Sequence, residues 1–354
     1  MRTSTTLGRG LGLLLATGVV TLAACRSSTE ESDAPGVQDQ ATIARPQYAN
    51  CKKYSKLSET GLYALDASGA PTSTLGEGVR EFRPSYEFWS DGAVKKRWIR
   101  LPPGSAIDTR DMDHWVFPKG TKLWKELARD GKPVETRLIE IGCDADPDHP
   151  EHGSGEYFLG AFAWNAEGTD ADLAPNGGPR GIPSQDACTR CHGSEPGGVL
   201  GFSALQLSEP DLPMTIDALV AEHRLSNPPP KGTAYRVPGD AVTKPALGYF
   251  HANCGYCHTE GGRAFFVNDQ QLRLSIADTQ KTDPRETSVL QSIVGRKAQG
   301  FIDEGWIRVV PGQPDKSFVF NRMSSTERRM PPGRTEIDTQ GVATVKAWIE
   351  SLHE

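Results

Sequence analysis

Two short segments of the chain repeat one pattern of chemistry-bearing residues. Residues 188–192 and 254–258 both read Cys-x-x-Cys-His. Two residues between the cysteines let both sulfurs reach the two vinyl groups of one porphyrin, and the adjacent histidine then ligates its iron. The pattern therefore predicts two covalently bound haem c groups. The residues that carry this prediction are Cys188, Cys191 and His192 in the first motif and Cys254, Cys257 and His258 in the second.

A zinc half-site or a redox dithiol is the alternative for a single Cys-x-x-Cys. The pattern occurs twice here, each time with its histidine, which favours haem iron over zinc.

The first 25 residues predict export from the cytoplasm. Arg2 and Arg9 precede an apolar stretch that is too short and too rich in glycine for a membrane span. The stretch ends in Leu-Ala-Ala-Cys, which resembles the lipobox of bacterial lipoproteins, so we expect Cys25 to be lipidated and to anchor the mature chain. An ordinary signal peptide cleaved nearby is the alternative. Both readings place the mature chain in the cell envelope, and lipidation places it on the periplasmic or outer side of a bacterial membrane.

Two cysteines remain outside the motifs and the lipobox. Of the seven cysteines in the chain, these are Cys51 and Cys143. An oxidising compartment permits a disulfide between them. Two free thiols are the alternative, because a sequence gives no distance between two cysteines.

The length of the chain and its net charge limit the number of domains and the classes of partner. The 354 residues suffice for more than one core. We divide them into a signal and lipobox at 1–25, a polar disordered tether at 26–45, a β-rich domain with the first motif at 46–240, and a helical domain with the second motif at 241–354. The formal charge of −6 gives no basic surface for nucleic acid. The expected partners are redox proteins of the cell envelope and, through the lipid, the membrane.

Short aromatic and β-branched runs between residues 80 and 168 predict antiparallel strands. The expected strands are Lys96–Leu101, His114–Phe117, Thr121–Leu127, Val134–Ile141 and Tyr157–Trp164, with turns at Pro118–Gly120 and Arg129–Lys132. Charged residues beside strands usually lie on exposed faces. We therefore expect the nearby lysines to be exposed: Lys95, Lys96, Lys119, Lys122 and Lys125.

The last part of the chain has helical spacing. Ala241–Asn253 leads into the second motif, and Asp338 is positioned to cap a helix with one apolar stripe. The stripe consists of Val342, Val345, Trp348, Ile349 and Leu352. The fold class expected for the whole chain is α+β: an antiparallel sheet domain ending in a haem site, then an all-α domain.

Met330 stands in a Met-Pro-Pro sequence before that last helix. A thioether is a soft iron ligand that raises the reduction potential, and the prolines restrict its loop. We predict Met330 as the distal ligand of the haem on His258. Met323, or a loop methionine without a special role, is the alternative.

The distal ligand of the first haem stays open. No Met-Pro sequence follows His192, and the candidates are Met214, His223, His251, Met112 and His114, or an open site. His251 has the competing interpretation of a histidine that packs within the helical domain.

Residues 241–354 resemble the class I cytochrome c domain, with an insertion between His258 and Met330. Phe82–Tyr86, Trp89–Ala93, Trp115–Lys122 and the two motifs together resemble a family of exported dihaem c-type cytochromes, mostly bacterial lipoproteins. That resemblance implies electron transfer outside the cytoplasm and favours a carrier over an enzyme.

Residues 80–200 resemble, more faintly, cytochrome P460 and the β-type cytochromes c′, in which a sheet carries a haem with an open distal side. That likeness implies a haem enzyme, acting on peroxide or a small nitrogen compound, or a gas-binding sensor. In P460-type enzymes a lysine is joined to the porphyrin.

Overall fold

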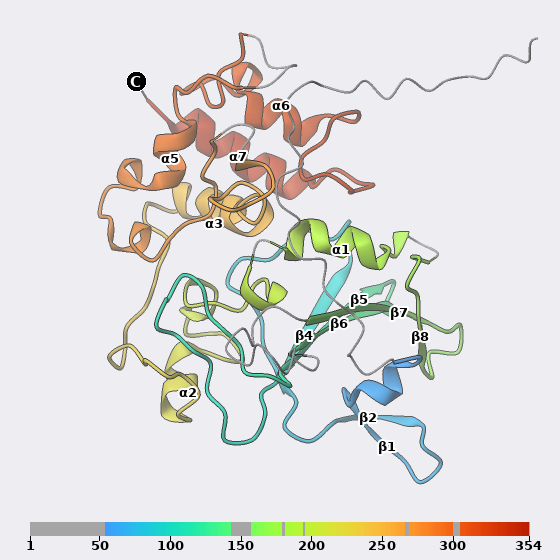
Figure 1. Cartoon of the computed structure of the whole chain (residues 1–354). Coiled ribbons are helices and arrows are strands. Elements are labelled where there is room, and N and C mark those ends of the chain that lie inside the picture. Colours follow the sequence, from blue (N-terminus) through green and yellow to red (C-terminus); the bar gives the residue numbers. More distant parts are fainter. Residues whose placement is uncertain are drawn as a thin grey trace, which may run out of the picture. The chain divides into compact units, whose positions relative to one another are not determined.

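The computed structural model describes residues 54–142, 157–178, 181–193, 195–265, 269–299 and 305–353. Figure 1 shows an antiparallel sheet in the N-terminal part and a group of helices in the C-terminal part. The expected mixed α+β class, with a sheet-rich N-terminal half, is confirmed. The signal segment, the tether, Cys25, Cys51 and Cys143 lie outside the described residues, so the predictions made for them stay predictions.

The main sheet has six strands in the order β3-β4-β5-β6-β7-β8, each antiparallel to its neighbours. Their bounds are Arg80–Glu81, Val94–Arg100, Lys122–Arg129, Lys132–Ile141, Tyr157–Trp164 and Ala171–Leu173. A separate hairpin pairs β1 (Tyr63–Leu65) with β2 (Pro71–Leu75).

The α-helices among the described residues are α1 (Gln185–His192), α2 (Ile216–Ala221), α3 (Thr243–Asn253), α5 (Ser288–Ile293), α6 (Phe318–Ser324) and α7 (Thr339–Ser351). The short 3-10 helices span Leu57–Thr60, Pro196–Gly198, Leu205–Leu207, Asp278–Gln280, Pro284–Glu286 and Pro314–Lys316. No helix in the described ranges is long and apolar enough to cross a membrane.

Local sequence explains the turn between β5 and β6. Asp130 and Gly131 both have positive φ, 50° and 74°. A two-residue hairpin turn of this kind matches the twist of its strands, and Asp-Gly is among its preferred sequences. The expected turn at Arg129–Lys132 is confirmed. The expected strand at His114–Phe117 is wrong: Val116 makes only an isolated bridge with Asp108, and the segment belongs to the long loop before β5.

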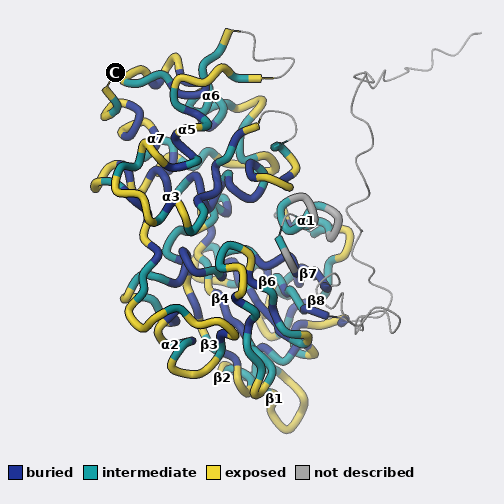
Figure 2. Tube along the Cα trace, turned by 60° about the vertical axis from the view of Figure 1, so that its left-hand side comes forward, coloured by how far each residue is buried: buried dark blue, intermediate teal, exposed yellow. Residues whose placement is uncertain are grey.

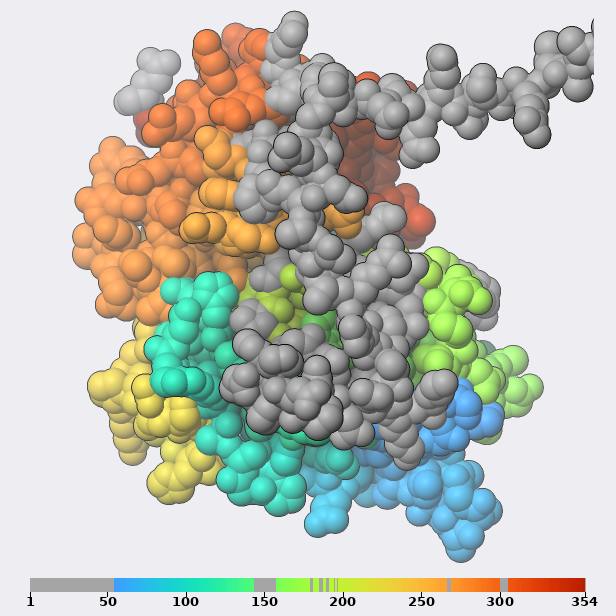
Figure 3. All heavy atoms as spheres, in the orientation of Figure 1, coloured from blue at the N-terminus to red at the C-terminus, as the bar shows by residue number. Residues whose placement is uncertain are grey.

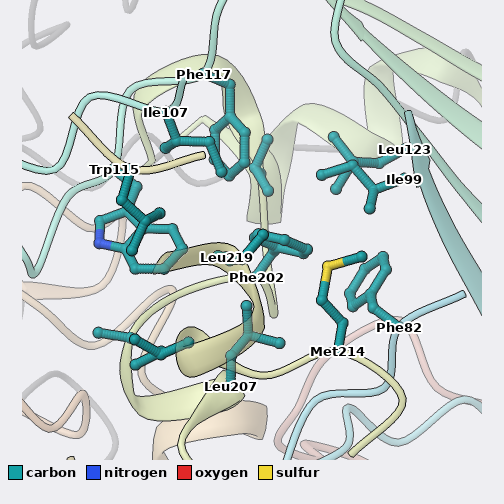
Figure 4. Packing of buried hydrophobic residues seen from close by; sticks show 14 of the residues in the cluster. Phe82, Ile99, Ile107, Trp115, Phe117, Leu123, Phe202, Leu207, Met214 and Leu219 are labelled. Carbon is teal, nitrogen blue, oxygen red and sulfur yellow. The ribbon is translucent and has the colours of Figure 1, made fainter. Parts of the chain in front are cut away.

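The two faces of the sheet bury different cores, because successive side chains of a strand point to opposite faces. Trp98, Trp124, Leu138 and Phe158 pack on one face with the N-terminal segment. Ile99, Leu123 and Leu159 pack on the other face with residues that follow α1. At the centre of this second cluster the Phe202 ring meets the rings of Phe82, Trp115 and Phe117 edge to face, as Figure 4 shows.

A third core holds the C-terminal helices together. Phe250 of α3 and Trp348 of α7 are fully buried, and their ring centroids lie 5.5 Å apart at 82°. The predicted cap of α7 is confirmed, because the Asp338 side chain accepts a hydrogen bond from the Gly341 amide at 2.8 Å. Figure 2 shows the buried segments along the sheet and inside this helical group, with the β1–β2 loop exposed.

Contacts from the long loop join the sheet part to the helical part. Asp113 accepts a hydrogen bond from the Ile276 amide at 2.7 Å, and its carbonyl accepts one from Arg273 at 2.5 Å. In Figure 3 this loop, in teal, lies against the orange residues that follow α3. All described residues belong to one compact unit. The boundary that we drew at residue 240 stays a prediction.

Candidate functional site

The first motif lies on α1, beside the sheet. The Nδ1 atom of His192 lies 2.6 Å from the Gly198 carbonyl oxygen. A carbonyl only accepts, so Nδ1 carries the proton and Nε2 keeps its lone pair for a metal. Burial lowers the pKa of His192 to about 4, so the imidazole is neutral, as a metal ligand must be.

Gly198 suits this position for two reasons. Its φ is +69°, and a side chain there would collide with the Tyr157 ring, because a Cβ atom would lie 2.8 Å from it. Glycine is the residue that tolerates both the backbone angle and the close approach. The chain can therefore bring the Gly198 carbonyl to the imidazole.

The second motif follows α3 directly and extends it by one turn. The Cys254 amide donates to the Phe250 carbonyl at 2.9 Å, and the His258 amide donates to the Cys254 carbonyl at 3.0 Å. Burial raises the pKa of the Cys254 thiol to about 12. The side chain of His258 is buried at 9% exposure. This motif thus lies against the core of the helical part.

The two motifs meet. The Cys191 thiol of the first motif and the Cys257 thiol of the second form a hydrogen bond, which lowers the pKa of Cys191 and raises that of Cys257. None of Cys188, Cys191, Cys254 and Cys257 is in a disulfide. The residues that the structure describes contain no group of three or more His, Cys, Asp or Glu placed to hold a metal ion.

Buried polar contacts fix the motifs to one another. Glu195, just after the first motif, forms an ion pair with Arg273 from the helical part. The Tyr256 hydroxyl, inside the second motif, accepts a hydrogen bond from the Gly201 amide at 3.0 Å. These two contacts join the segment that follows the first motif to the second motif and to the residues after it.

A cavity of about 510 Å³ opens between the sheet, α1 and the second motif. Its volume lies in the range of sites for small molecules and cofactors. Cys188, Cys191, His192 and Cys257 line it, together with apolar residues such as Leu123, Ile139 and Leu159. The lining carries more cations than carboxylates: Arg97, Lys125, Arg129, Arg137, Arg263 and Arg334 against Asp91 and Glu135.

The donor set of the first motif fits haem. Haem c needs two reduced thiols, a neutral histidine with a free Nε2 and a largely apolar enclosure, and its propionates need cations. Cys188, Cys191 and His192 would hold one group in the cavity; Cys254, Cys257 and His258 would hold the second.

Our expectation that the lysines near the sheet are exposed is wrong for three of them. The side chain of Lys95 is 12% exposed, and its ammonium pairs with Glu87 at 2.9 Å. Lys122 is 7% exposed, and its ammonium donates to Tyr54 at 2.7 Å. Lys125 lines the cavity, where burial, Arg137 and Arg97 lower its pKa well below the ordinary value. One signal was present in the sequence: Leu123, Lys125 and Leu127 alternate along one strand and therefore share one face.

None of the candidates for the distal ligand of the first haem lines this cavity. Met214 is 2% exposed in the cluster of Figure 4, and Met112 packs against that cluster. His114 is exposed and pairs with Asp111, and His223 is exposed at a positive φ of 55°. His251 is buried and accepts a hydrogen bond from the Leu274 amide at 3.2 Å, which agrees with its alternative packing role.

Met330 is half-buried, and its amide donates to the Arg322 carbonyl at 2.9 Å. The residues that follow it, Pro332 to Thr335, line the cavity beside Cys257. Met323 is buried in the helical core at 4% exposure. Ligation by Met330 stays a prediction.

Comparison with known proteins assigns no family to this chain. No protein-family model, no curated protein and no solved structure matches the chain.

Proposed function

We propose that this chain is a dihaem c-type cytochrome that transfers electrons outside the cytoplasm, anchored by a lipid on Cys25. The bound haem iron would supply one-electron redox chemistry. The protein contributes the attachment thiols, the fixed imidazoles and the enclosure. The tautomer of His192, set by the Gly198 carbonyl, supports the assignment of the first motif.

One observation carries the electron-transfer proposal: the two motifs meet at Cys191 and Cys257, and Cys257 lines the cavity beside the first motif. Each of these cysteines would form a thioether at the edge of its own porphyrin. Contact between the two thiols therefore brings the two attachment edges together. Adjacent haem edges suit electron exchange within one chain.

The surroundings of the second motif also suit a carrier. Its helix α3 packs on α7 through Phe250 and Trp348, and the Met-Pro-Pro sequence precedes α7. This order of helix, motif, methionine loop and helix is the basis of the proposed class I cytochrome c domain. A tightly packed enclosure keeps rearrangement small when an electron arrives.

The test is a reductive titration of the purified, lipid-free protein after its haems per chain are counted. We expect two covalent haems that are reduced reversibly in two one-electron steps. A chain that holds fewer than two haems, or haems that are not reduced and reoxidised reversibly, contradicts the proposal. The count is made by mass spectrometry of the denatured chain, because only thioether-bound haem survives denaturation.

A second function is favoured by one specific observation. Among the described residues that line the cavity, His192 is the only histidine and no methionine occurs. An open first haem would make the protein an enzyme for peroxide or a small nitrogen compound, or a gas sensor. Carbon monoxide added to the reduced protein separates the functions: binding by one of the two haems supports an open site, and binding by neither supports a plain carrier.

A further inference from the structure

A row of cations crosses the sheet on the side of the cavity. The strand register pairs Arg97 of β4 with Lys125 of β5, and Lys125 with Arg137 of β6. All three residues line the cavity together with His192. Like charges directly opposite one another on neighbouring strands are destabilising. The row therefore needs compensation from other groups.

Compensation within the chain is partial. Arg137 pairs with Glu135 at 2.6 Å, and Glu87 lies 3.5 Å from Arg97. Glu87 also forms an ion pair with Lys95, at 2.9 Å. The central cation of the row, Lys125, forms no ion pair among the residues that the structure describes.

Arg334, from the loop after Met330, is a further cation that lines the cavity. It contacts the same ring as Lys125: the Lys125 ammonium is 5.7 Å from the Phe88 ring centroid, and the Arg334 guanidinium is 4.6 Å from it. A ring face attracts each cation weakly and cancels no charge. The cavity thus collects cations from the sheet and from the Met-Pro-Pro loop, and fewer carboxylates than cations line it.

We propose that Arg97, Lys125, Arg137 and Arg334 form a binding site for an anionic group, a carboxylate or a small oxyanion, in the cavity beside His192. The inference rests on the proposed function only in that the first motif must hold its haem. Guanidinium groups bind carboxylates and oxyanions through paired, charge-assisted hydrogen bonds. Two sources have this chemistry: a small oxyanion from solution that reaches the first haem, and a propionate of the haem itself.

The test uses the holoprotein, with two haems per chain verified first. Nitrite is titrated into the wild type, into Lys125→Met and into Lys96→Met, and binding is followed by visible absorption and calorimetry. Lys96 is the matched control, because it is an exposed lysine on the neighbouring strand. The reduction potentials of both haems are measured in each protein. Arg334→Gln provides a second variant outside the sheet if Lys125→Met does not fold.

A free oxyanion as the occupant predicts nitrite binding to the wild type that is weakened about tenfold or more in Lys125→Met or Arg334→Gln and unchanged in Lys96→Met. A propionate as the occupant predicts no nitrite binding, a lower potential of one haem in Lys125→Met or Arg334→Gln, and no change in Lys96→Met. Absence of nitrite binding together with unchanged potentials in the cavity variants overturns the inference. A haem count below two is a different result and counts against the proposed function.

Discussion

The two Cys-x-x-Cys-His motifs have the same five-residue pattern and contrasting surroundings. The first lies on α1 beside a sheet face, where His192 lines a cavity together with a row of cations. The second continues α3 into the helical core, where Cys254 and His258 are shielded by packing. The same motif thus stands in two environments, one beside an open cavity lined by cations and the other packed in a helical core.

This contrast assigns different tasks to the two halves of the site. A haem held by the helical motif would have little room for a substrate and would suit electron transfer. A haem held by the sheet motif would face a space of about 510 Å³ lined by Arg97, Lys125 and Arg137. The contact between Cys191 and Cys257 would link the two tasks.

The largest expected effect comes from removing one pair of attachment thiols. Replacing Cys188 and Cys191 by alanine should remove the sheet-side haem only, and replacing Cys254 and Cys257 should remove the helix-side haem only. Each double variant should therefore carry one covalent haem per chain, measured by mass spectrometry of the denatured protein. The two variants serve as controls for each other. Loss of both haems from either variant would show that the two halves do not bind haem independently.

Met330→Ala should change the helix-side haem and leave the sheet-side haem as it is. Loss of the thioether should lower the potential of one haem and let one additional haem per reduced chain bind carbon monoxide. Met323→Leu is the control, since Met323 is buried in the helical core and the substitution roughly conserves volume. Unchanged axial-ligand spectra in Met330→Ala would refute the assignment.

Phe250→Ala tests whether packing holds the helical motif. Phe250 is fully buried against Trp348 and lies one turn before Cys254. We expect the free energy of unfolding to fall by about 3–5 kcal/mol. Val242→Ala, at a residue 37% exposed beside the start of α3, should change it by less than about 0.5 kcal/mol. Urea denaturation of the holoprotein measures both, and equal effects would argue against a packed helical core.

The smallest effect concerns the ion pairs that border the cation row. Burial raises the pKa of Glu87, but Arg97 and Lys95 outweigh it and hold the pKa below the ordinary value. A carboxyl whose pKa is lower in the folded state stabilises the fold above its unfolded pKa, about 4.3, and loses this contribution as the pH falls through the folded value.

Glu87→Gln should therefore cost about 1 kcal/mol or less at pH 7, and the cost should shrink toward pH 3. Unfolding free energies of the variant and the wild type at the two pH values give the comparison. A cost that stays the same at both values would mean that the charge of Glu87 contributes nothing.

Local signals in the sequence were sufficient for the helical half. The Asp338 cap, the stripe through Trp348 and the helix before Cys254 depend on residues a few positions apart, and all three are confirmed. The Asp130-Gly131 turn is local too. Element boundaries shifted by at most two residues, as with Thr243, where α3 begins.

The cation row could not be predicted, because its two pairings depend on strand register. The pairing of Lys125 with Arg97 joins β4 and β5, which the long loop separates. The pairing of Lys125 with Arg137 depends on a register shift between Leu127 and Ala128, which the Asp130-Gly131 turn does not determine. Met214 illustrates the same limit. Its thioether qualified it as a ligand in the sequence, and only the fold places it in an apolar core.

The central claim is that the two motifs hold their haems edge to edge in one chain. Electron paramagnetic resonance of the oxidised wild type, compared with the two single-haem variants, tests it most directly. Adjacent haems predict a wild-type spectrum that differs from the sum of the two single-haem spectra through magnetic coupling. A wild-type spectrum equal to that sum would contradict the claim.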